Sequence, residues 1–269
     1  MKFSIITINY NNRQGLLYTI DSVVCQTYMD YEWIVIDGGS TDGSRELLEE
    51  YQQHFAYWCS EPDKGVYNAM NKGIDHAEGE YLLFLNSGDV LYDENVLLQV
   101  DNLHSEADII SGQVERMDNH QLLRVYHPSI LRQLYYSTLN HQGTFIKKTC
   151  FGNLRYDERL EVVSDWKFWL EAIIKEKATV EVIDIIVARQ DMTGISSIAP
   201  DLDKSERKKV LNEYFPLLIQ KDLTNYWKMM NSTYVQRGEY LSKNSDFAYK
   251  MGIRIMGLLV RIIKLIKKS

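Results

Sequence analysis

The chain has 269 residues, of which 45% are hydrophobic and 25% charged, and this balance is typical of a soluble globular protein. It excludes a disordered chain, a collagen-like repeat and a disulfide-rich scaffold. The net charge is −7, but residues 247–269 hold six basic side chains and no acidic one, so residues 1–246 carry −13. Because general nucleic-acid binding needs a basic surface, this acidic body argues against it.

The N-terminal segment predicts a buried strand, because residues 3–8, FSIITI, form a short run of apolar, mostly β-branched side chains. We expect no signal peptide here, since the run is short and includes Thr7, Asn9 follows it, and no small-residue cleavage site comes after. The three cysteines are far apart, which fits neither a disulfide framework nor a metal site. They predict buried, reduced thiols in a cytoplasmic protein.

Strands and helices alternate through the first ninety residues. Apolar runs predict strands at residues 3–8, 32–36, 55–60 and 81–85. Helical spacing and a cap at Ser44 predict helices at residues 16–24, 44–51 and 66–76. Since each connection is long enough for a crossover, the alternation predicts a parallel sheet covered by helices on both faces.

Polar loops follow these four strands at the edge where ligands bind in such sheets. They carry Asn9, Asp37, Asp63 and Asp89. Three carboxylates at one edge would build a poor core, so this edge is the predicted site.

The pattern changes after residue 105, where the predicted strands become short. They lie at residues 109–110, 122–126, 143–147 and 180–187. Predicted helices lie at 129–139, at 164–175 with Ser164 as the cap, and through most of 200–245. We therefore expect a second part with a different arrangement.

Two of the strand-end acids have chemistry that suits a nucleotide site. Asp37 can accept hydrogen bonds from a base or a ribose, or it can cap its own loop. The glycine-rich stretch after it has neither a dinucleotide-binding nor a P-loop spacing. Asp89, beside Gly88, suits a hard divalent cation, since Mg²⁺ takes only one or two protein carboxylates; the alternative is an Asp in a turn.

Two residues of the second part could act on a proton. Asp165 opens a predicted helix, whose dipole favours its ionised form, so it could cap that helix or act as a general base. His141 could be a base, a ligand or simply a polar loop residue, and a lone histidine is most often the last of these.

Four motifs then identify a resemblance. In order, they are FSIITINYN, EWIVIDGGSTDGS, SEPDKGVYNAMNKGI and GEYLLFLNSGD. They resemble the family 2 glycosyltransferases with the GT-A fold over about residues 1–200, most closely bacterial enzymes that build capsular polysaccharide, O-antigen and other exopolysaccharides. The resemblance implies transfer of a hexosyl or N-acetylhexosaminyl group, with inversion, from a UDP-sugar to a hydroxyl of a glycan or lipid-linked acceptor.

The resemblance also implies roles on the nucleotide side. Thr7 and Asn9 would face the nucleotide, and Asp37 would recognise the base, usually uracil. Asp63 and Lys64 would lie close to the nucleotide.

The resemblance also implies roles in the transfer itself: Asp89 would bind Mn²⁺ or Mg²⁺, and Asp165 would be the general base. His141 and Gln142 would line the acceptor side, and Ser196 would lie near the diphosphate. The ion would offset the charge that develops on the leaving diphosphate. Inversion needs one base on the opposite face of the sugar and no covalent intermediate.

The chain departs from the family pattern at two places. Where many relatives have paired acids before the metal ligand, this chain has Ser87 and Gly88, so the ribose contact falls to Asn86 or to a backbone group. Where relatives often have Glu-Asp at the base, this chain has Ser164 before Asp165, which leaves one acid there.

We expect a GT-A domain over residues 1–200, with a nucleotide-binding part at about 1–105 and an acceptor part at about 106–200. A helical extension over residues 201–269 would follow and end in a basic amphipathic helix at 247–269.

That last helix predicts a surface for an anionic membrane. At about 100° per residue, its basic side chains gather on one narrow face, except Lys267. Its longest uncharged run, residues 255–260, is far short of the ~20 residues of a spanning helix. A cytoplasmic protein held at the inner face of the bacterial plasma membrane would follow, and a polyprenyl-linked acceptor would suit that place. The alternative is a helix packed on the acidic body or on a second subunit.

Two rival functions stay open. A nucleotide-binding protein without transferase activity would keep Asp37 and Asp89 but would not use Asp165. A nucleotidyltransferase would need a glycine-rich, basic triphosphate loop near the first strand. Residues 9–13 offer one arginine and no glycine.

Overall fold

The structure is a computed structural model that describes residues 1–123, 133–134, 137–192, 199–230 and 232–266. Contacts divide the chain into two compact units, Met1–Arg207 and Lys208–Ser269. The boundary between the units falls inside helix α8 (Pro200–Tyr214), whereas the extension was predicted to begin at residue 201.

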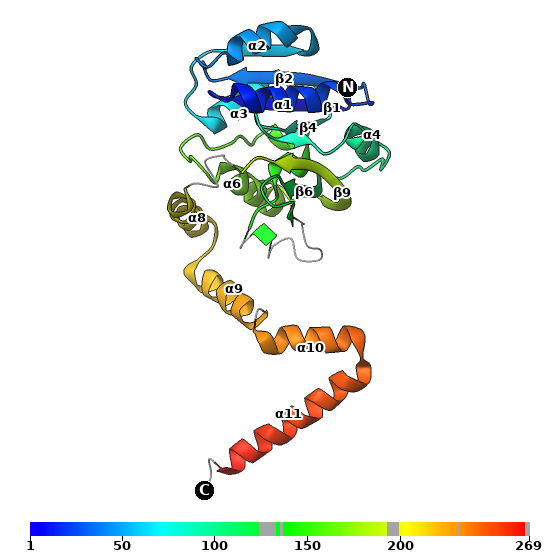
Figure 1. The fold of residues 1–269 in the computed structure, drawn as a ribbon. Helices are drawn as coiled ribbons and strands as arrows, with labels where there is room; N and C mark the ends of the chain where they lie inside the picture. The colour runs from blue at the N-terminus through cyan, green and yellow to red at the C-terminus, as the bar shows by residue number, and fades with distance from the viewer. Residues whose placement is uncertain (124–132, 135–136, 193–198, 231, 267–269) are drawn as a thin grey trace. The chain divides into compact units, whose positions relative to one another are not determined.

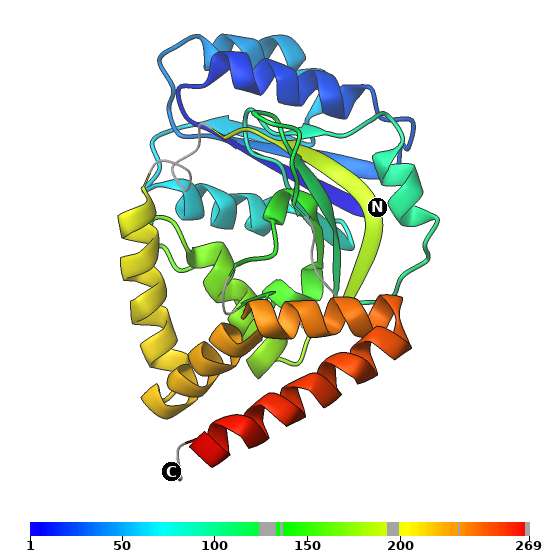
Figure 2. The same cartoon turned by 60° about the horizontal axis from the view of Figure 1, so that its bottom comes forward.

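The first unit is built on one sheet whose first four strands are parallel, in the order β3-β2-β1-β4. These strands are β1 (Phe3–Asn9), β2 (Tyr31–Asp37), β3 (Tyr57–Ser60) and β4 (Tyr81–Phe84). The helices between them are α1 (Arg13–Val24), α2 (Ser44–Tyr51), with the single turn η1 (Gln52–His54) after it, and α3 (Val66–His76). Figure 1 and Figure 2 show α1 and α2 on one face of the sheet and α3 on the other.

Both faces of this part of the sheet are buried against helices. On the α1 side, alternate strand residues such as Phe3, Ile5 and Trp33 pack with Leu16 and Ile20 of α1, as the period of two in a strand requires. On the α3 side, a Cβ at Gly73 would lie 2.4 Å from the Ile6 side chain, so only glycine lets this helix approach β1 so closely.

The second half of the first unit continues the same sheet with mixed strand directions. After β4 the order is β8, β6, β9 and β5, with β7 paired to β6. These strands are β5 (Val90–Leu91), β6 (Ile109–Arg116), β7 (Leu122–Leu123), β8 (Thr144–Lys147) and β9 (Val180–Gln190). β8 runs antiparallel to both β4 and β6, whereas β6 and β9 are parallel. The helices are α4 (Val96–Asp101), the turns η2 (His141–Gly143) and η3 (Lys148–Phe151), α6 (Ser164–Leu170) and its π-helical continuation η4 (Glu171–Lys175).

The predicted α/β class, with a sheet flanked by helices and a helical C-terminal part, is confirmed, but several boundaries were wrong. β6 and β9 are longer than predicted and β3 is shorter. Most of the predicted helix 129–139 lies outside the described residues; residues 133–134 are helical and 137–139 are not. The cysteines are free, but the expectation of buried thiols was wrong: Cys25 is exposed, and Cys59 and Cys150 are only partly buried.

Neither predicted serine cap is a cap, because each serine is already the first residue of its helix. Ser44 donates its N–H and its hydroxyl to Asp42 Oδ1, at 3.1 and 2.6 Å. Gly43, with φ of 91°, makes the turn between them. At the other helix, the Ser164 hydroxyl accepts the backbone N–H of Asp157.

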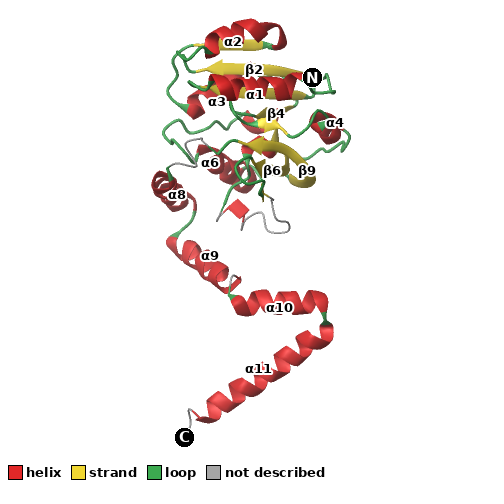
Figure 3. Ribbon diagram, viewed as in Figure 1, coloured by secondary structure: helices red, strands yellow, loops and turns green. Residues whose placement is uncertain are grey.

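The second unit is helical (Figure 3). After the end of α8 it contains α9 (Leu217–Met230), α10 (Thr233–Asn244) and α11 (Asp246–Ile266). Within the described ranges, no helix combines the length and the apolar character needed to cross a membrane.

Candidate active site

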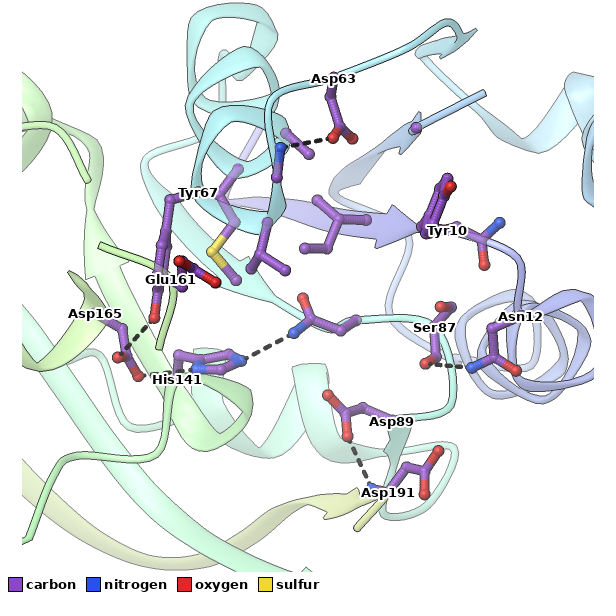
Figure 4. A pocket seen from close by; sticks show the side chains of 18 of the residues that line it. Tyr10, Asn12, Asp63, Tyr67, Ser87, Asp89, His141, Glu161, Asp165 and Asp191 are labelled. Atoms are coloured by element: carbon purple, nitrogen blue, oxygen red, sulfur yellow. Dashed lines mark hydrogen bonds and ion pairs between the residues drawn. The ribbon is translucent and has the colours of Figure 1, made fainter. Parts of the chain in front are cut away.

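A cavity of about 840 Å³ opens at the carboxyl edge of the sheet, in the size range of small-molecule sites. Loops after β1, β2, β3, β4 and β9 form its walls, together with α3, η2 and the start of α6. Figure 4 shows side chains from these segments pointing toward one another. Of the predicted site residues, the cavity brings together Asn9, Asp63, Asn86, Asp89, His141, Gln142 and Asp165.

Asp37 lies beneath this cavity and not on its wall. It is fully buried, and the parallel register of β1 and β2 sets it opposite Asn9. Its carboxylate accepts the N–H and the hydroxyl of Ser40, the hydroxyl of Ser60 and the side-chain N–H of Asn9, at 2.6 to 2.9 Å. This is the loop-capping arrangement, and Asp37 acts on the cavity through Asn9.

Among Asp37 and its hydrogen-bond donors, Asn9 is the residue that lines the cavity. It is 3% exposed, and its side-chain oxygen is buried with no hydrogen-bond partner among the described residues. An unpaired buried acceptor is unfavourable, so Asn9 offers a hydrogen bond to a donor group on a ligand.

Two residues predicted on the nucleotide side do not line the cavity. Thr7 is fully buried, and its hydroxyl accepts the indole N–H of Trp33 at 3.0 Å, so it faces the helix-covered core. Lys64 lies in the exposed turn after Asp63, where its backbone N–H donates to Asn68. Asp63 itself does line the cavity and accepts the N–H of Gly65 at 2.8 Å.

Asp89 and Asp191 stand side by side in the cavity (Figure 4). Asp89 is 4% exposed and accepts the backbone N–H of Asp191 at 2.9 Å. Burial raises the pKa of Asp89 to about 6, although the charge of His141 and the Asp191 N–H act in the opposite direction. A Cβ at Gly88 would lie 2.6 Å from Asp191 Oδ2, so the two strand ends approach closely at this point.

These carboxylates fit a divalent cation that is shared with a ligand. Within the described part of the chain, no group of three or more His, Cys, Asp or Glu side chains could hold a metal by itself. Mg²⁺, however, typically takes only one or two protein carboxylates and completes its shell with water and phosphate oxygens. A buried carboxylate whose pKa is raised is also a group that a nearby cation would stabilise.

Asp165 belongs to a chain of hydrogen bonds that crosses the cavity wall (Figure 4). Its Oδ2 lies 3.2 Å from His141 Nδ1, and His141 Nε2 lies 3.2 Å from Asn86 Nδ2. If Nδ1 carries the proton, both contacts are hydrogen bonds: His141 donates to Asp165 and accepts from Asn86. The hydroxyl of Tyr67 donates its proton to the Val162 carbonyl at 2.6 Å and lies 3.3 Å from Asp165 Oδ1, and burial holds the pKa of Tyr67 well above its ordinary value, so this hydroxyl stays protonated.

The two remaining predicted residues have different outcomes. Gln142 is 4% exposed and lines the cavity, where its side chain acts to lower the pKa of Asp89 against the effect of burial. Ser196, together with Gly194 and Ile195, lies outside the described residues.

Sequence reasoning missed several residues of the cavity wall, namely Tyr10, Asn12, Tyr67, Glu161, Gln190 and Asp191. Asp191 had a usable signal, since it directly follows a strand, and Asp89 lies in the loop after β4. The predicted strand ended at residue 187, three residues before the end of β9, and this hid the signal.

Known proteins share both the sequence and the fold. Residues 4–159 match the family model described as glycosyl transferase family 2. This chain belongs to glycosyl transferase family 2. An uncharacterized glycosyltransferase of Mycobacterium tuberculosis is 34% identical to this family 2 chain over 203 residues, which are 72% of this chain and 76% of the relative. A PGL/p-HBAD biosynthesis glycosyltransferase of the same species is 29% identical over 214 residues, 76% of this chain and 83% of the relative.

Solved structures confirm a GT-A-like fold for this family 2 chain. Staphylococcus aureus TarS 1-349 in complex with UDP-GlcNAc matches with a TM-score of 0.61 and 19% identity, over 71% of this chain and 58% of that one. The mannosyltransferase PcManGT of Pyrobaculum calidifontis, in complex with GDP-Man and Mn²⁺, matches with a TM-score of 0.63 and 14% identity, over 96% and 80%. The predicted family, fold and glycosyltransferase class are thus confirmed. Asp165 and Asp191 lie beyond the residues of the family match.

Proposed function

We propose that this family 2 glycosyltransferase moves a sugar from a UDP-sugar to a hydroxyl of a glycan or lipid-linked acceptor, with inversion, in cell-surface polysaccharide biosynthesis. The observation that carries the proposal is that one cavity is lined by Asn9, Asp63, Asp89 and Asp165, to which we assign the nucleotide, the cation and the acceptor. The two solved neighbours have a nucleotide sugar in their complexes, which supports a donor of this class.

On the donor side, the proposed contacts follow from what is unpaired or exposed. The amide oxygen of Asn9 would accept from the uracil, and the ring of Tyr10, 68% exposed at the cavity, offers a face for the base. Asp89 and Asp191 would hold Mn²⁺ or Mg²⁺, which when bound offsets the negative charge of the diphosphate. Asn86, at the same strand end, is placed to contact the ribose or the diphosphate.

On the acceptor side, Asp165 would take the proton from the attacking hydroxyl. The acceptor oxygen would form a bond to the anomeric carbon as the bond from that carbon to the diphosphate breaks, and this in-line displacement inverts the configuration. His141 would orient the Asp165 carboxylate by its hydrogen bond to Oδ2, and the Tyr67 hydroxyl, 3.3 Å from Oδ1, would pack against the other oxygen. A binder without transferase activity would have no use for this arrangement.

A screen of nucleotide sugars tests the proposed function. We expect UDP release from at least one of UDP-GlcNAc, UDP-GalNAc, UDP-glucose and UDP-galactose with Mn²⁺ or Mg²⁺, and weaker binding of GDP-mannose in calorimetry. An α-linked donor should give a β-linked product, which proton NMR of the anomeric signal measures. Absence of binding for every UDP-sugar would remove the donor site, and retention of the α configuration would exclude the single displacement.

We also propose that α11 holds the enzyme on an anionic membrane surface at the cytoplasmic face. Its apolar side chains are unusually exposed: Phe247 is 75% exposed and Leu258 60%. Lys250 pairs with Asp246 at 2.6 Å, whereas the helix after Asp246 has only basic charges. A helix that is both basic and apolar binds in the interface of an anionic bilayer.

Deleting residues 247–269 is expected to release the protein from phosphatidylglycerol vesicles and leave the first unit folded. A second variant replaces by glutamine the five basic residues of the narrow face, which are Lys250, Arg254, Arg261, Lys264 and Lys268. It should show a smaller, salt-sensitive loss of vesicle binding, because charge and apolar area both contribute. Sedimentation with vesicles at two salt concentrations measures both effects, with neutral phosphatidylcholine vesicles as the control. If the full-length chain stays in solution with anionic vesicles at low salt, α11 packs on protein instead.

A further inference from the structure

We infer that α8 positions the catalytic base: Glu206 and Arg207, two consecutive residues of this helix, hold the chain on both sides of Asp165. This inference rests on the proposed function, because only there is Asp165 a base. It assigns part of the reaction to a segment beyond residues 4–159, which are those of the family match.

Glu206 holds the segment that precedes Asp165. Its carboxylate is only 3% exposed and accepts three consecutive backbone N–H groups. Glu161 N–H donates to Oε1 at 2.8 Å, and Val162 N–H and Val163 N–H donate to Oε2 at 3.0 and 3.2 Å. Charge-assisted bonds of this kind are stronger than neutral ones, and three of them compensate the burial of one carboxylate.

Arg207 holds the residue that follows Asp165. Its guanidinium lies 4.6 Å from the ring centre of Trp166, within the range of a cation–π contact. The same guanidinium donates to the carbonyl of Ser137 at 2.9 Å and pairs with Asp203 at 2.7 Å. Trp166 is fully buried, so this contact fixes the first turn of α6 from one side.

The segment that Glu206 holds forms part of the cavity wall and reaches the base. Glu161 and Val162 line the cavity. The Val162 carbonyl accepts the Tyr67 hydroxyl at 2.6 Å, and that hydroxyl lies 3.3 Å from Asp165 Oδ1. A shift of residues 161–163 would therefore move Tyr67 and Asp165 together, whereas Asn9, at the end of β1, and Asp89, in the loop after β4, belong to other segments and would stay in place.

Glu206→Gln is the variant that tests this positioning role. Glutamine keeps the volume but has one oxygen in place of two, so its amide N–H would face backbone N–H groups that have lost their acceptor. With the UDP-sugar that gives the fastest UDP release in the screen, and water as the acceptor, we expect kcat to fall by about tenfold or more, since small misplacements are costly in catalysis. The donor KM and the calorimetric affinity for UDP should change less than about twofold. Asp201→Asn, which removes an almost fully exposed carboxylate from the same helix, is the matched control and should behave as the wild type.

A double variant separates positioning from general loosening of the fold. In an Asp165→Asn background, Glu206→Gln should lower kcat no further, because its effect acts through Asp165. If Glu206→Gln does not fold, Arg207→Met replaces it; methionine keeps the apolar contact with Trp166 and removes the charge, and the same split between kcat and UDP affinity is expected.

The inference is overturned if kcat stays at the wild-type value, if kcat and UDP affinity fall together, or if the double variant shows a further loss. Its failure differs from that of the proposed function. If Asp165→Asn is inactive while Glu206→Gln is normal, only the role of α8 is lost. If the wild type releases no UDP, or Asp165→Asn turns over normally, the assignment of the base is lost first.

Discussion

Replacing Asp165 by asparagine is expected to lower transfer by the ~10²–10⁴-fold typical of losing a general base, while UDP and cation binding stay near the wild type. Asn keeps an oxygen that can accept the Trp166 N–H, now bound at 2.8 Å, so the start of α6 should hold. What is lost is the acceptor for the proton of the attacking hydroxyl. Single-turnover transfer and calorimetry with UDP measure the two sides separately.

Asp75→Asn serves as the matched control, since it removes an exposed carboxylate of α3 that pairs with Arg155 at 3.0 Å. It should leave both measurements unchanged. Transfer near the wild-type rate in Asp165→Asn would show that Asp165 only supports its helix. His141, which lies 3.2 Å from it, would then be the next residue to replace.

Replacing Asp89 by asparagine is expected to abolish most transfer and to remove the dependence of UDP affinity on Mn²⁺ or Mg²⁺. A neutral amide is a much poorer ligand for a hard cation than a carboxylate. Calorimetry with UDP, with and without the ion, separates this loss from the loss of the base, because Asp165→Asn keeps the ion dependence. Equal UDP affinity of Asp89→Asn and the wild type in the presence of the ion would remove the cation from this position.

Although Asp89→Asn should lose activity, we expect it to raise the stability of the metal-free protein. The pKa of Asp89 is raised from 3.8 to about 6 by burial, so the folded state binds a proton more tightly than the unfolded state. The stability that this proton provides is complete below pH ~4 and is lost as the pH rises through about 6. Above pH 7 without metal, Asp89→Asn should therefore be more stable than the wild type, by an amount of the order of 2–3 kcal/mol. Urea unfolding at pH 4 and pH 7.5 measures it, and the difference should vanish at the lower pH.

The cavity residues that could be predicted from the sequence are those at the ends of strands. Asn9 and Asp89 were found because each follows an apolar run, and a parallel sheet brings such positions to one edge. Thr7 was expected to face the nucleotide, but it lies two residues before the end of β1, where its hydroxyl accepts the indole N–H of Trp33, and it does not line the cavity. Ile8 and Asn9, the last two residues of β1, are the ones that line the cavity.

The contributions of α8 could not be predicted from the sequence. Glu206 looks like any acid in a polar helix, and nothing in its spacing indicates that it is buried. Its position depends on how the segment 161–163 folds back, which is a tertiary contact across more than forty residues. The pairing of Asp89 with Asp191 depends in the same way on where β9 ends, a boundary that periodicity fixes only to within a few residues.

The four hydrogen bonds to Asp37 have a consequence for how a nucleotide enters. Since all of them come from the protein, the cavity wall at Asn9 is already shaped before any ligand arrives, and the Asn9 amide is already held by Asp37 and Ser40. A nucleoside that meets a preorganised wall immobilises few side chains, so little of its contact energy is spent on ordering the protein. If the proposed base contact is made here, recognition of the base would be rigid, and any adjustment during catalysis would fall to the segments around Asp165.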